Sequence, residues 1–360
     1  MAVKTIVSVI GARPQFIKAA PVSRALAPVF KEVLIHTGQH YDFSMSDLFF
    51  EELGIRPPDL NLGIGSGSHG EQTGRMLIEL ENALTTLKPD CVMVYGDTNS
   101  TLAGALTAAK MQIPIAHVEA GLRSYNRDMP EEINRVVCDH LSALLFCPTV
   151  NAVKNLASEG ISKGVHNVGD VMYDAMRYDL TIARKQPNVL KRLGLVKYQY
   201  AMVTFHRAGN TDNVDRMMAI MHALGQLKTT VMFPVHPRTK RTLTESNLPV
   251  SPNVRMIEPV GHLDMLILEE NANCILTDSG GIQKEAYLLG TRCITLREET
   301  EWVETVTAGW NKLTGVSPDA IRTAFETWFP AGERPALYGD GHAAEKIREV
   351  LLTSLLQGTA

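Results

Sequence analysis

The sequence has no run of basic residues and no long apolar stretch, and each shortage excludes a class of protein. Its 35 lysines and arginines face 39 aspartates and glutamates, for a formal net charge of −4. This charge gives no support for binding to nucleic acid or to a membrane surface. No apolar run approaches the roughly 20 residues of a membrane-spanning helix, and the apolar start is too short for a signal peptide. We therefore expect a soluble, cytoplasmic protein.

Cysteines are also few, and none of them form a CxxC pair. The five are Cys91, Cys138, Cys147, Cys274 and Cys293, and most lie in or beside apolar runs typical of strands. Small buried hydrophobic residues in a reducing compartment explain them better than disulfides or a zinc site would.

What the sequence does have is an alternation of short β-branched runs with longer helical patterns, which is typical of parallel α/β sheets. A chain of 360 residues has room for two sizeable cores. In the first half, the expected strands are Thr5–Ile10, Glu32–His36, Val92–Tyr95, Pro114–Val118, Leu144–Cys147 and Val165–Val168. In the second half, they are Tyr200–Thr204, Thr230–Val235, Val254–Ile257, Cys274–Thr277, Cys293–Leu296 and Lys312–Leu313. The two sets predict two doubly wound parallel-sheet domains.

The boundary between the domains is expected in the polar stretch 169–199, which separates the two sets of strands. We place the first domain at residues 1–168 and the second at residues 169–341. The apolar residues of 342–355 fall on one helical face and predict an amphipathic helix. This helix, within residues 342–360, is expected to pack back on the first domain.

Three carboxylates mark one end of the predicted first sheet. Asp97 follows the apolar run Cys91–Tyr95, and Glu119 follows Ile113–Val118. Glu131 comes after a polar loop that ends in proline. The carboxyl ends of parallel strands face the ligand, and acidic groups are costly to bury there unless they bind or react. The three carboxylates therefore predict an enzyme.

Two neighbouring polar residues receive a structural interpretation. His117 lies inside a predicted strand and is interpreted as a packing residue. Its spacing to Glu119 is compatible with zinc, but no further ligands accompany it, so we expect no metal. Glu132, in the first turn of the next helix, is interpreted as a stabiliser of the helix dipole.

In the second half, the residues Ser279-Gly280-Gly281 join a predicted strand to a helix. Unpaired N–H groups and the dipole at a helix start bind phosphate, and glycines let the backbone come close to a bulky anion. Glu285, about one turn further, is placed to accept hydrogen bonds from a ribose diol. We favour ligand binding over the alternative, a Ser-capped helix with glycines for packing.

Cationic residues follow several predicted strands. Arg13 and Lys18 could both reach an anion above the first sheet, although a plain surface role is an equal alternative. Their loop lacks the GxGxxG and GxxxxGK[ST] patterns, so no dinucleotide or P-loop site is expected. His206 and Arg207 follow the first strand of the second half, where function and structure are evenly matched. For His236, a structural role is favoured over an effector or phosphate contact.

These residues resemble those of the non-hydrolysing UDP-N-acetylglucosamine 2-epimerase family. The resemblance runs in order through nearly the whole chain, in the segments GARPQFIK, HTGQH, YGDTNST, HVEAGLRS, MPEEINR, FHRAGN, PVHPR and TDSGGIQKEA. It implies two Rossmann-like domains of the glycosyltransferase-B type with the active site in the interdomain cleft. It also implies a homodimer without metal, nicotinamide or other cofactor. Such enzymes invert C2 of a UDP-linked 2-acetamido sugar, and their products serve cell-surface polysaccharide biosynthesis.

The reaction that the resemblance implies accounts for the acidic strand ends. Elimination of UDP across C1–C2 gives a glycal, and readdition with protonation from the other face inverts C2. This requires acid and base groups on two faces of the ring and cations for the diphosphate. By resemblance, Asp97 and Glu131 transfer protons, and Glu119 orients the sugar or stabilises an oxocarbenium ion. His206 is implied as a catalytic residue that assists the leaving group. The implied substrate-binding residues are Arg13, Lys18, Arg207, Ser279, Gly280, Gly281 and Glu285.

The chain departs from the family pattern at three positions. Gly209 stands where glutamate is usual, Trp302 replaces an arginine that faces the ligand, and Met265 replaces an aromatic residue near the uracil. The segments GARPQFIK, HRAGNTDN and TEWVE are instead similar to a subgroup that acts on UDP-2,3-diacetamido-2,3-dideoxy-glucuronate. A uronate would favour a cation near C6, which Arg127 or Arg297 could supply.

The resemblance also extends to a regulatory site. In regulated members a second UDP-GlcNAc activates the enzyme through residues like Gln39, His40, Arg75 and His236, and all four are present. Three alternatives stay open: a hydrolysing epimerase, a glycosyltransferase, for which the three carboxylates are harder to explain, and a nucleotide-sugar sensor, which Gly209 motivates.

Overall fold

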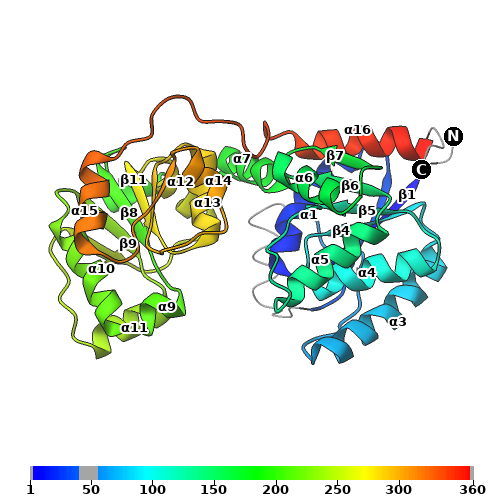
Figure 1. The fold of residues 1–360 in the computed structure, drawn as a ribbon, viewed down its shortest axis with the longest axis horizontal. Coiled ribbons are helices and arrows are strands. Elements are labelled where there is room, and N and C mark those ends of the chain that lie inside the picture. Colours follow the sequence, from blue (N-terminus) through cyan, green and yellow to red (C-terminus); the bar gives the residue numbers. More distant parts are fainter. Residues whose placement is uncertain (1–2, 40–55, 357–360) are drawn as a thin grey trace. The chain divides into compact units, whose positions relative to one another are not determined.

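A computed structural model describes residues 3–39 and 56–356 of the chain. The chain divides into two units: residues 1–177 with 336–360, and residues 178–335. Each unit contains one parallel sheet with helices packed on it (Figure 1). The domain boundaries expected from the sequence fall near these divisions and stay predictions.

The first unit is built on a seven-stranded parallel sheet with the strand order β3-β2-β1-β4-β5-β6-β7. Its strands are β1 (Thr5–Ile10), β2 (Lys31–His36), β3 (Leu60–Asn61), β4 (Cys91–Tyr95), β5 (Ile115–Val118), β6 (Leu144–Cys147) and β7 (Val165–Asn167). Val7 of β1 pairs with Val33 of β2 on one side and with Val92 of β4 on the other. The strand order therefore reverses between β1 and β4, and open α/β sheets bind ligands at such a switch point.

Helices cover both faces of this sheet. They are α1 (Arg13–Leu26), α3 (His69–Leu87), α4 (Asn99–Lys110), α5 (Pro130–Leu141), α6 (Val150–Ser158), α7 (Val171–Ala183), within which the chain passes into the second unit, and α16 (Ala343–Leu356). Helix α16, red in Figure 1, packs against α1, and its Ile347 and Leu351 are buried. Asp174 of α7 caps α16 by accepting hydrogen bonds from the N–H groups of Ala343 and Ala344 at 3.1 and 2.7 Å.

The second unit has a six-stranded parallel sheet with the order β10-β9-β8-β11-β12-β13. Its strands are β8 (Tyr200–Thr204), β9 (Thr230–Pro234), β10 (Val254–Ile257), β11 (Cys274–Thr277), β12 (Cys293–Thr295) and β13 (Asn311–Leu313). Its helices are α8 (Val189–Leu193), α9 (Ala208–Thr211), α10 (Val214–Gln226), α11 (Pro237–Glu245), α12 (His262–Glu270), α13 (Gly280–Leu289), α14 (Val303–Thr307) and α15 (Pro318–Thr327). Here the switch point lies between β8 and β11.

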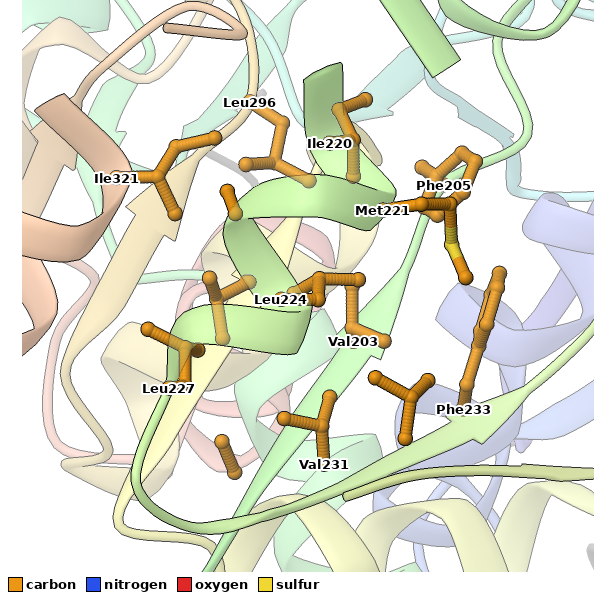
Figure 2. Close-up of a cluster of buried hydrophobic side chains, with 14 of the residues drawn as sticks. Val203, Phe205, Ile220, Met221, Leu224, Leu227, Val231, Phe233, Leu296 and Ile321 are labelled. Carbon is orange, nitrogen blue, oxygen red and sulfur yellow. The ribbon is translucent and has the colours of Figure 1, made fainter. Parts of the chain in front are cut away.

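Both faces of the second sheet are apolar, because helices cover both. On β8, Ala201 and Val203 belong to the core under α10 and α15, whereas Tyr200 and Met202 belong to the core under α8 and α12. Figure 2 shows the first of these cores, in which Leu224 of α10 lies over the sheet near Val203. Burial of each large apolar side chain contributes about 1.5–3 kcal/mol, which holds the strand ends in fixed positions.

The prediction of two doubly wound parallel sheets is confirmed. Every expected strand is present, with ends that differ by no more than one residue. Only the two-residue strand β3 was missed, because it is too short to give an apolar run. Among the described residues, none of the helices combines the length and the apolar character that crossing a bilayer requires.

Candidate active site

The loops after β1 and β4 meet at the switch point of the first sheet, and one buried glutamine joins them. The side-chain oxygen of Gln15 accepts hydrogen bonds from the N–H groups of Gly11 and Ala12 at 2.8 and 3.0 Å. Its amide nitrogen donates to the carbonyl oxygen of Tyr95 at the end of β4, at 2.7 Å. Because a buried amide needs partners for both ends, Gln15 fixes the spacing of the two loops.

Glu119 lies just after β5 and forms an ion pair with Lys18 of α1. Its φ of +71° is strained for a residue with a side chain. The two side chains are only 13% and 14% exposed. Burial lowers the pKa of Lys18, but Glu119, Asp97 and Asp170 together outweigh it and raise that pKa, so the ammonium stays charged. Lys18 is therefore held among carboxylates.

Gly96 brings the loop after β4 close to this ion pair. Its φ is +64°, and an added Cβ would lie 3.2 Å from Oε2 of Glu119 and 3.3 Å from Nζ of Lys18. Both the backbone conformation and the tight space therefore favour glycine. The next residue, Asp97, accepts a hydrogen bond from Nη2 of Arg135 in α5 at 2.5 Å. The Asp97 side chain remains 32% exposed, so it can meet a substrate.

The two glutamates at the start of α5 differ in environment. The Glu131 side chain is exposed and, within the described residues, forms neither a hydrogen bond nor an ion pair. Glu132 is buried, and its carboxylate accepts hydrogen bonds from the Ser124 N–H and hydroxyl and the Tyr125 N–H, each at 2.9 Å. Burial acts to raise the pKa of Glu132, but these hydrogen bonds and Arg135 lower it overall. Glu132 therefore holds the loop before α5, a role that the dipole interpretation missed.

In the second unit, a buried carboxylate organises the loop after β8. Asp278 is fully buried and accepts hydrogen bonds from the N–H groups of His206 and Arg207, both at 3.1 Å, and from Nδ2 of Asn210 at 3.0 Å. A buried carboxylate is tolerated only when hydrogen bonds replace its water. The side chains of His206 and Arg207, which are 50% and 47% exposed, thus project from a fixed backbone.

The segment Ser279–Gly281 forms the turn into α13, as the sequence predicted. Within the described part of the chain, the Ser279 side chain makes no capping hydrogen bond to α13. The Ser279 hydroxyl therefore does not block the N–H groups at the start of this helix. A Cβ on Gly280 would overlap Oε1 of Glu301, which shows how closely that carboxylate approaches the helix start. Glu301 pairs with Arg207 at 3.3 Å and with Arg297 at 2.9 Å.

Glu285 lies in α13 close to a second glutamate, Glu269 of α12, which is fully buried. Burial raises the pKa of Glu285, against the lowering effect of His262 and Lys284. Burial and the nearby Glu285 raise the pKa of Glu269 well above its ordinary value, which favours its protonated, neutral form. No sequence pattern indicated this carboxyl pair.

The residues expected at a regulatory site are distributed over both units. Gln39, after β2, accepts hydrogen bonds from the N–H and hydroxyl of Ser100 at 3.1 and 2.6 Å. Arg75 lies on the surface of α3. His236 lies in the second unit, before α11. His40 lies outside the described residues.

The other predicted residues lie near the two switch points. The ring centroids of His236 and His206 lie 6.4 Å apart, so the loops after β8 and β9 bring these two histidines close together. Arg13 is exposed at the start of α1. In residues 3–39 and 56–356, no three His, Cys, Asp or Glu side chains are grouped as a metal ion would require.

Known proteins are similar to this chain in both sequence and fold. The family model described as UDP-N-acetylglucosamine 2-epimerase matches residues 24–352. The chain is 52% identical over 352 residues to a UDP-N-acetylglucosamine 2-epimerase homolog of Methanococcus maripaludis, covering 96% of this chain and 99% of that one. It is 46% identical over 356 residues to the UDP-2,3-diacetamido-2,3-dideoxy-D-glucuronate 2-epimerase of Pseudomonas aeruginosa, with the same coverage. The solved UDP-GlcNAc 2-epimerase of Methanocaldococcus jannaschii is 44% identical, with a TM-score of 0.87 over 97% of this chain and 99% of that chain.

The fold of the chain gives its structural class, and its sequence gives its family within that class. The glycosyltransferase CalG4 shares the fold alone, at 13% identity and a TM-score of 0.55, so the two parallel-sheet units are of the glycosyltransferase-B type. Within this class, the chain belongs to the UDP-N-acetylglucosamine 2-epimerase family. It is therefore an isomerase; the predicted family is confirmed, and so is the predicted relationship to the diacetamido-glucuronate 2-epimerase.

Proposed function

We propose that the protein inverts C2 of a UDP-linked 2-acetamido sugar by elimination and readdition of UDP. The observation that carries this proposal is the group of Asp97, Glu119 and Lys18 at the switch point of the first sheet. There a partly exposed carboxylate lies near a buried ion pair, as acid/base chemistry at a sugar ring requires. Relatives of the chain are named as enzymes that act at C2 of such sugars.

The reaction needs a proton to leave C2 and return on the opposite face. A carboxylate takes the C2 proton, the C–H electrons form the C1–C2 double bond, and UDP leaves with the electrons of the C1–O bond. UDP then returns to C1 while C2 is protonated from the other face. We assign the two proton transfers to Asp97 and Glu131, which are both accessible to solvent. Glu119, held by Lys18, orients the sugar and stabilises positive charge at C1.

The second unit is assigned the UDP part of the substrate. The start of α13, with Ser279, Gly280 and Gly281, offers N–H groups and a positive dipole end to the diphosphate. Arg207 and His206 project nearby from the loop that Asp278 fixes, and His206 can protonate the leaving UDP. The assignments of ribose contact to Glu285 and of phosphate contact to Arg13 and Lys18 follow the same proposal.

The substituents of the sugar are a second level of the proposal. The chain is 46% identical to the diacetamido-glucuronate 2-epimerase and 45% identical to the UDP-N-acetylglucosamine 2-epimerase of Methanocaldococcus jannaschii. Both sugars are therefore candidates, and UDP-GlcNAc is the first choice. For the uronate, Arg127 or Arg297 would face the carboxylate at C6. Faster turnover of the uronate would assign the chain to that substrate.

The remaining expectations belong to the same proposal. The enzyme would work in the cytoplasm as a homodimer and supply sugars for cell-surface polysaccharides. UDP-GlcNAc would also act as an activator, and the residues that bind it as activator would be Gln39, His40, Arg75 and His236. Removing the imidazole of His236 would then abolish activation and leave basal turnover intact.

One experiment tests the reaction itself. The protein is incubated with UDP-GlcNAc in D2O, and C2 is followed by NMR. A manno product with deuterium at C2 is expected, because the returning proton comes from a group that exchanges with solvent. Release of free sugar would show a hydrolysing epimerase, whereas tight binding without turnover of either nucleotide sugar would show a sensor. Either of these results would refute the proposal.

A further inference from the structure

A fully buried histidine contacts the loop that carries Asp97, and the proposed chemistry does not use it. His117 lies in β5 with no exposed surface. Its Nε2 is 2.7 Å from the carbonyl oxygen of Gly96, and its Nδ1 is 2.7 Å from Oδ1 of Asp139 in α5. A carbonyl oxygen only accepts hydrogen bonds, so Nε2 must carry a hydrogen.

The surroundings of Asp139 place a second hydrogen on the ring. Oδ2 of Asp139 accepts hydrogen bonds from the Gly121 N–H at 3.1 Å and from Nη1 of Arg123 at 2.7 Å. With a guanidinium beside it, Asp139 is held as a carboxylate, so the hydrogen between Asp139 and His117 lies on Nδ1. Both ring nitrogens then carry hydrogen, and His117 is a buried imidazolium. Burial lowers the pKa of His117, but Asp139 raises it overall, in agreement with this geometry.

Arg123 extends the group into a compensated network. Its guanidinium binds both carboxylate oxygens of Glu159, at the end of α6, at 2.7 Å each. The Arg123 side chain is 1% exposed. Two buried cations, His117 and Arg123, therefore meet two carboxylates, Asp139 and Glu159. Buried charges of this kind are stable only as a complete set, since loss of one member leaves the others uncompensated.

The network binds the backbone at two points beside the candidate catalytic residues. His117 holds the carbonyl of Gly96, which immediately precedes Asp97. Asp139 holds the N–H of Gly121, which follows Glu119 by two residues. Both glycines have left-handed φ values, +64° and +80°. Such conformations persist where surrounding structure over-determines them, and here the network supplies the fixing contacts.

We propose that His117, Asp139 and Arg123 are positioning residues that set the spacing of Asp97 and Glu119 by holding the two loops. The inference rests on the proposed function for the roles of those two carboxylates. The positioning residues touch no substrate. A misplacement of about 1 Å at reacting groups can lower a rate by about 100-fold, so fixed spacing matters more for turnover than for binding.

The test combines kinetics with the charge of the ring. The variant His117→Gln keeps an amide that can reach Gly96 but cannot donate to Asp139 and Gly96 as an imidazolium does. It is expected to lower kcat about 10- to 100-fold with KM for the UDP-sugar changed less than about 3-fold. The matched control is His222→Gln, an exposed histidine of α10 in the second unit whose ring bonds Gln226, which should leave both constants unchanged.

Two further readouts separate this inference from the proposed reaction. Nitrogen-15 NMR of labelled histidines should show one ring, absent in His117→Gln, that is doubly protonated at pH 7. Hydrogen exchange of residues 95–98 should be faster in His117→Gln than in the wild type and the control. Neither readout needs turnover, so both apply even if the D2O experiment fails. A neutral ring at pH 7, or a folded His117→Gln protein with unchanged kcat, would overturn the inference.

Discussion

The two units build their sites with the charges arranged in opposite ways. In the first unit, the cations Lys18 and Arg135 hold the side chains of carboxylates at the switch point. In the second unit, the carboxylate of Asp278 holds the backbone of the loop that carries His206 and Arg207. One switch point therefore presents acids supported by bases, and the other presents bases supported by an acid.

Burial distinguishes the groups that present chemistry from those that support it. Asp97 is 32% exposed at its strand end, whereas Asp278, at the matching place in the second sheet, has no exposed surface. An exposed carboxylate can exchange protons with a substrate, while a buried and fully hydrogen-bonded one is committed to its partners. Asp97 and Asp278 thus share a position at a strand end, and the number of hydrogen bonds that each carboxylate already accepts decides whether it reacts or supports the loop.

The largest effect is expected at Asp97, the exposed carboxylate to which the comparison of the two units gives a reacting role. Asp97→Asn removes the proton acceptor but keeps the size of the side chain, and kcat for epimerisation should fall about 10²- to 10⁴-fold. A coupled assay that detects the manno product measures kcat, and the unfolding curves of the variant should match those of the wild type. The control is Asp215→Asn, an exposed residue of α10. Wild-type turnover in Asp97→Asn would move the reacting role elsewhere.

The supporting role predicts a smaller loss of a different kind. In Asp278→Asn an amide N–H₂ would face three donors, so the loop that carries His206 and Arg207 should lose its fixed position. UDP affinity, measured by calorimetry, should weaken about 10- to 100-fold, corresponding to roughly 1–3 kcal/mol for an unmet buried polar group. Asp319→Asn, an exposed aspartate of α15, is the control. Unchanged UDP affinity would separate this loop from nucleotide binding.

A third change tests the acid that lies among the bases of the second unit. Glu301 pairs with Arg207 and Arg297 close to the start of α13. A diphosphate at this place would compete with the Glu301 carboxylate, so Glu301→Gln should tighten UDP binding about 2- to 10-fold. Calorimetry in low and high salt measures the change, with Glu326→Gln as control. Weaker binding would show that Glu301 helps to hold the nucleotide.

The smallest effect concerns stability and its dependence on pH. The pKa of Glu269 is raised in the folded protein, so the unfolded chain loses this proton first, from about its ordinary value of 4.5 upward. The contribution of Glu269 to stability is therefore complete below that pH. It declines as the pH rises and levels off once the folded carboxyl also ionises. Glu269→Gln should flatten this decline and add about 1 kcal/mol at pH 7. Thermal unfolding from pH 4 to 9, with Glu270→Gln as control, measures it; parallel curves would contradict the expectation.

The fold was predictable because both signals that define it are local. Buried parallel strands such as Cys91–Tyr95 are short apolar runs, and the polar or glycine residues after them end each strand. Chemistry-bearing residues directly after those runs, such as Asp97 and Ser279, could be named for the same reason. Strand β3 escaped because two residues form no pattern.

The supporting contacts were not predictable, because they join segments far apart in the chain. Gln15 reaches Tyr95 across 80 positions, and Arg135 reaches Asp97 across 38. No local pattern marks such residues. His117 is buried as its interpretation required, but its partner Asp139 lies on another element, so its charge could not be read from the strand alone.

The placement of α16 has a consequence for how the chain matures. The first unit is completed by a helix that begins at Ala343, whereas the second unit, residues 178–335, is continuous. During synthesis on the ribosome, the middle of the chain emerges whole while the opening segment still lacks its last helix. The carboxylates near the beginning of the protein would therefore reach their final setting last, and a fragment that stops before Ala343 would leave the buried face of α1 exposed to water.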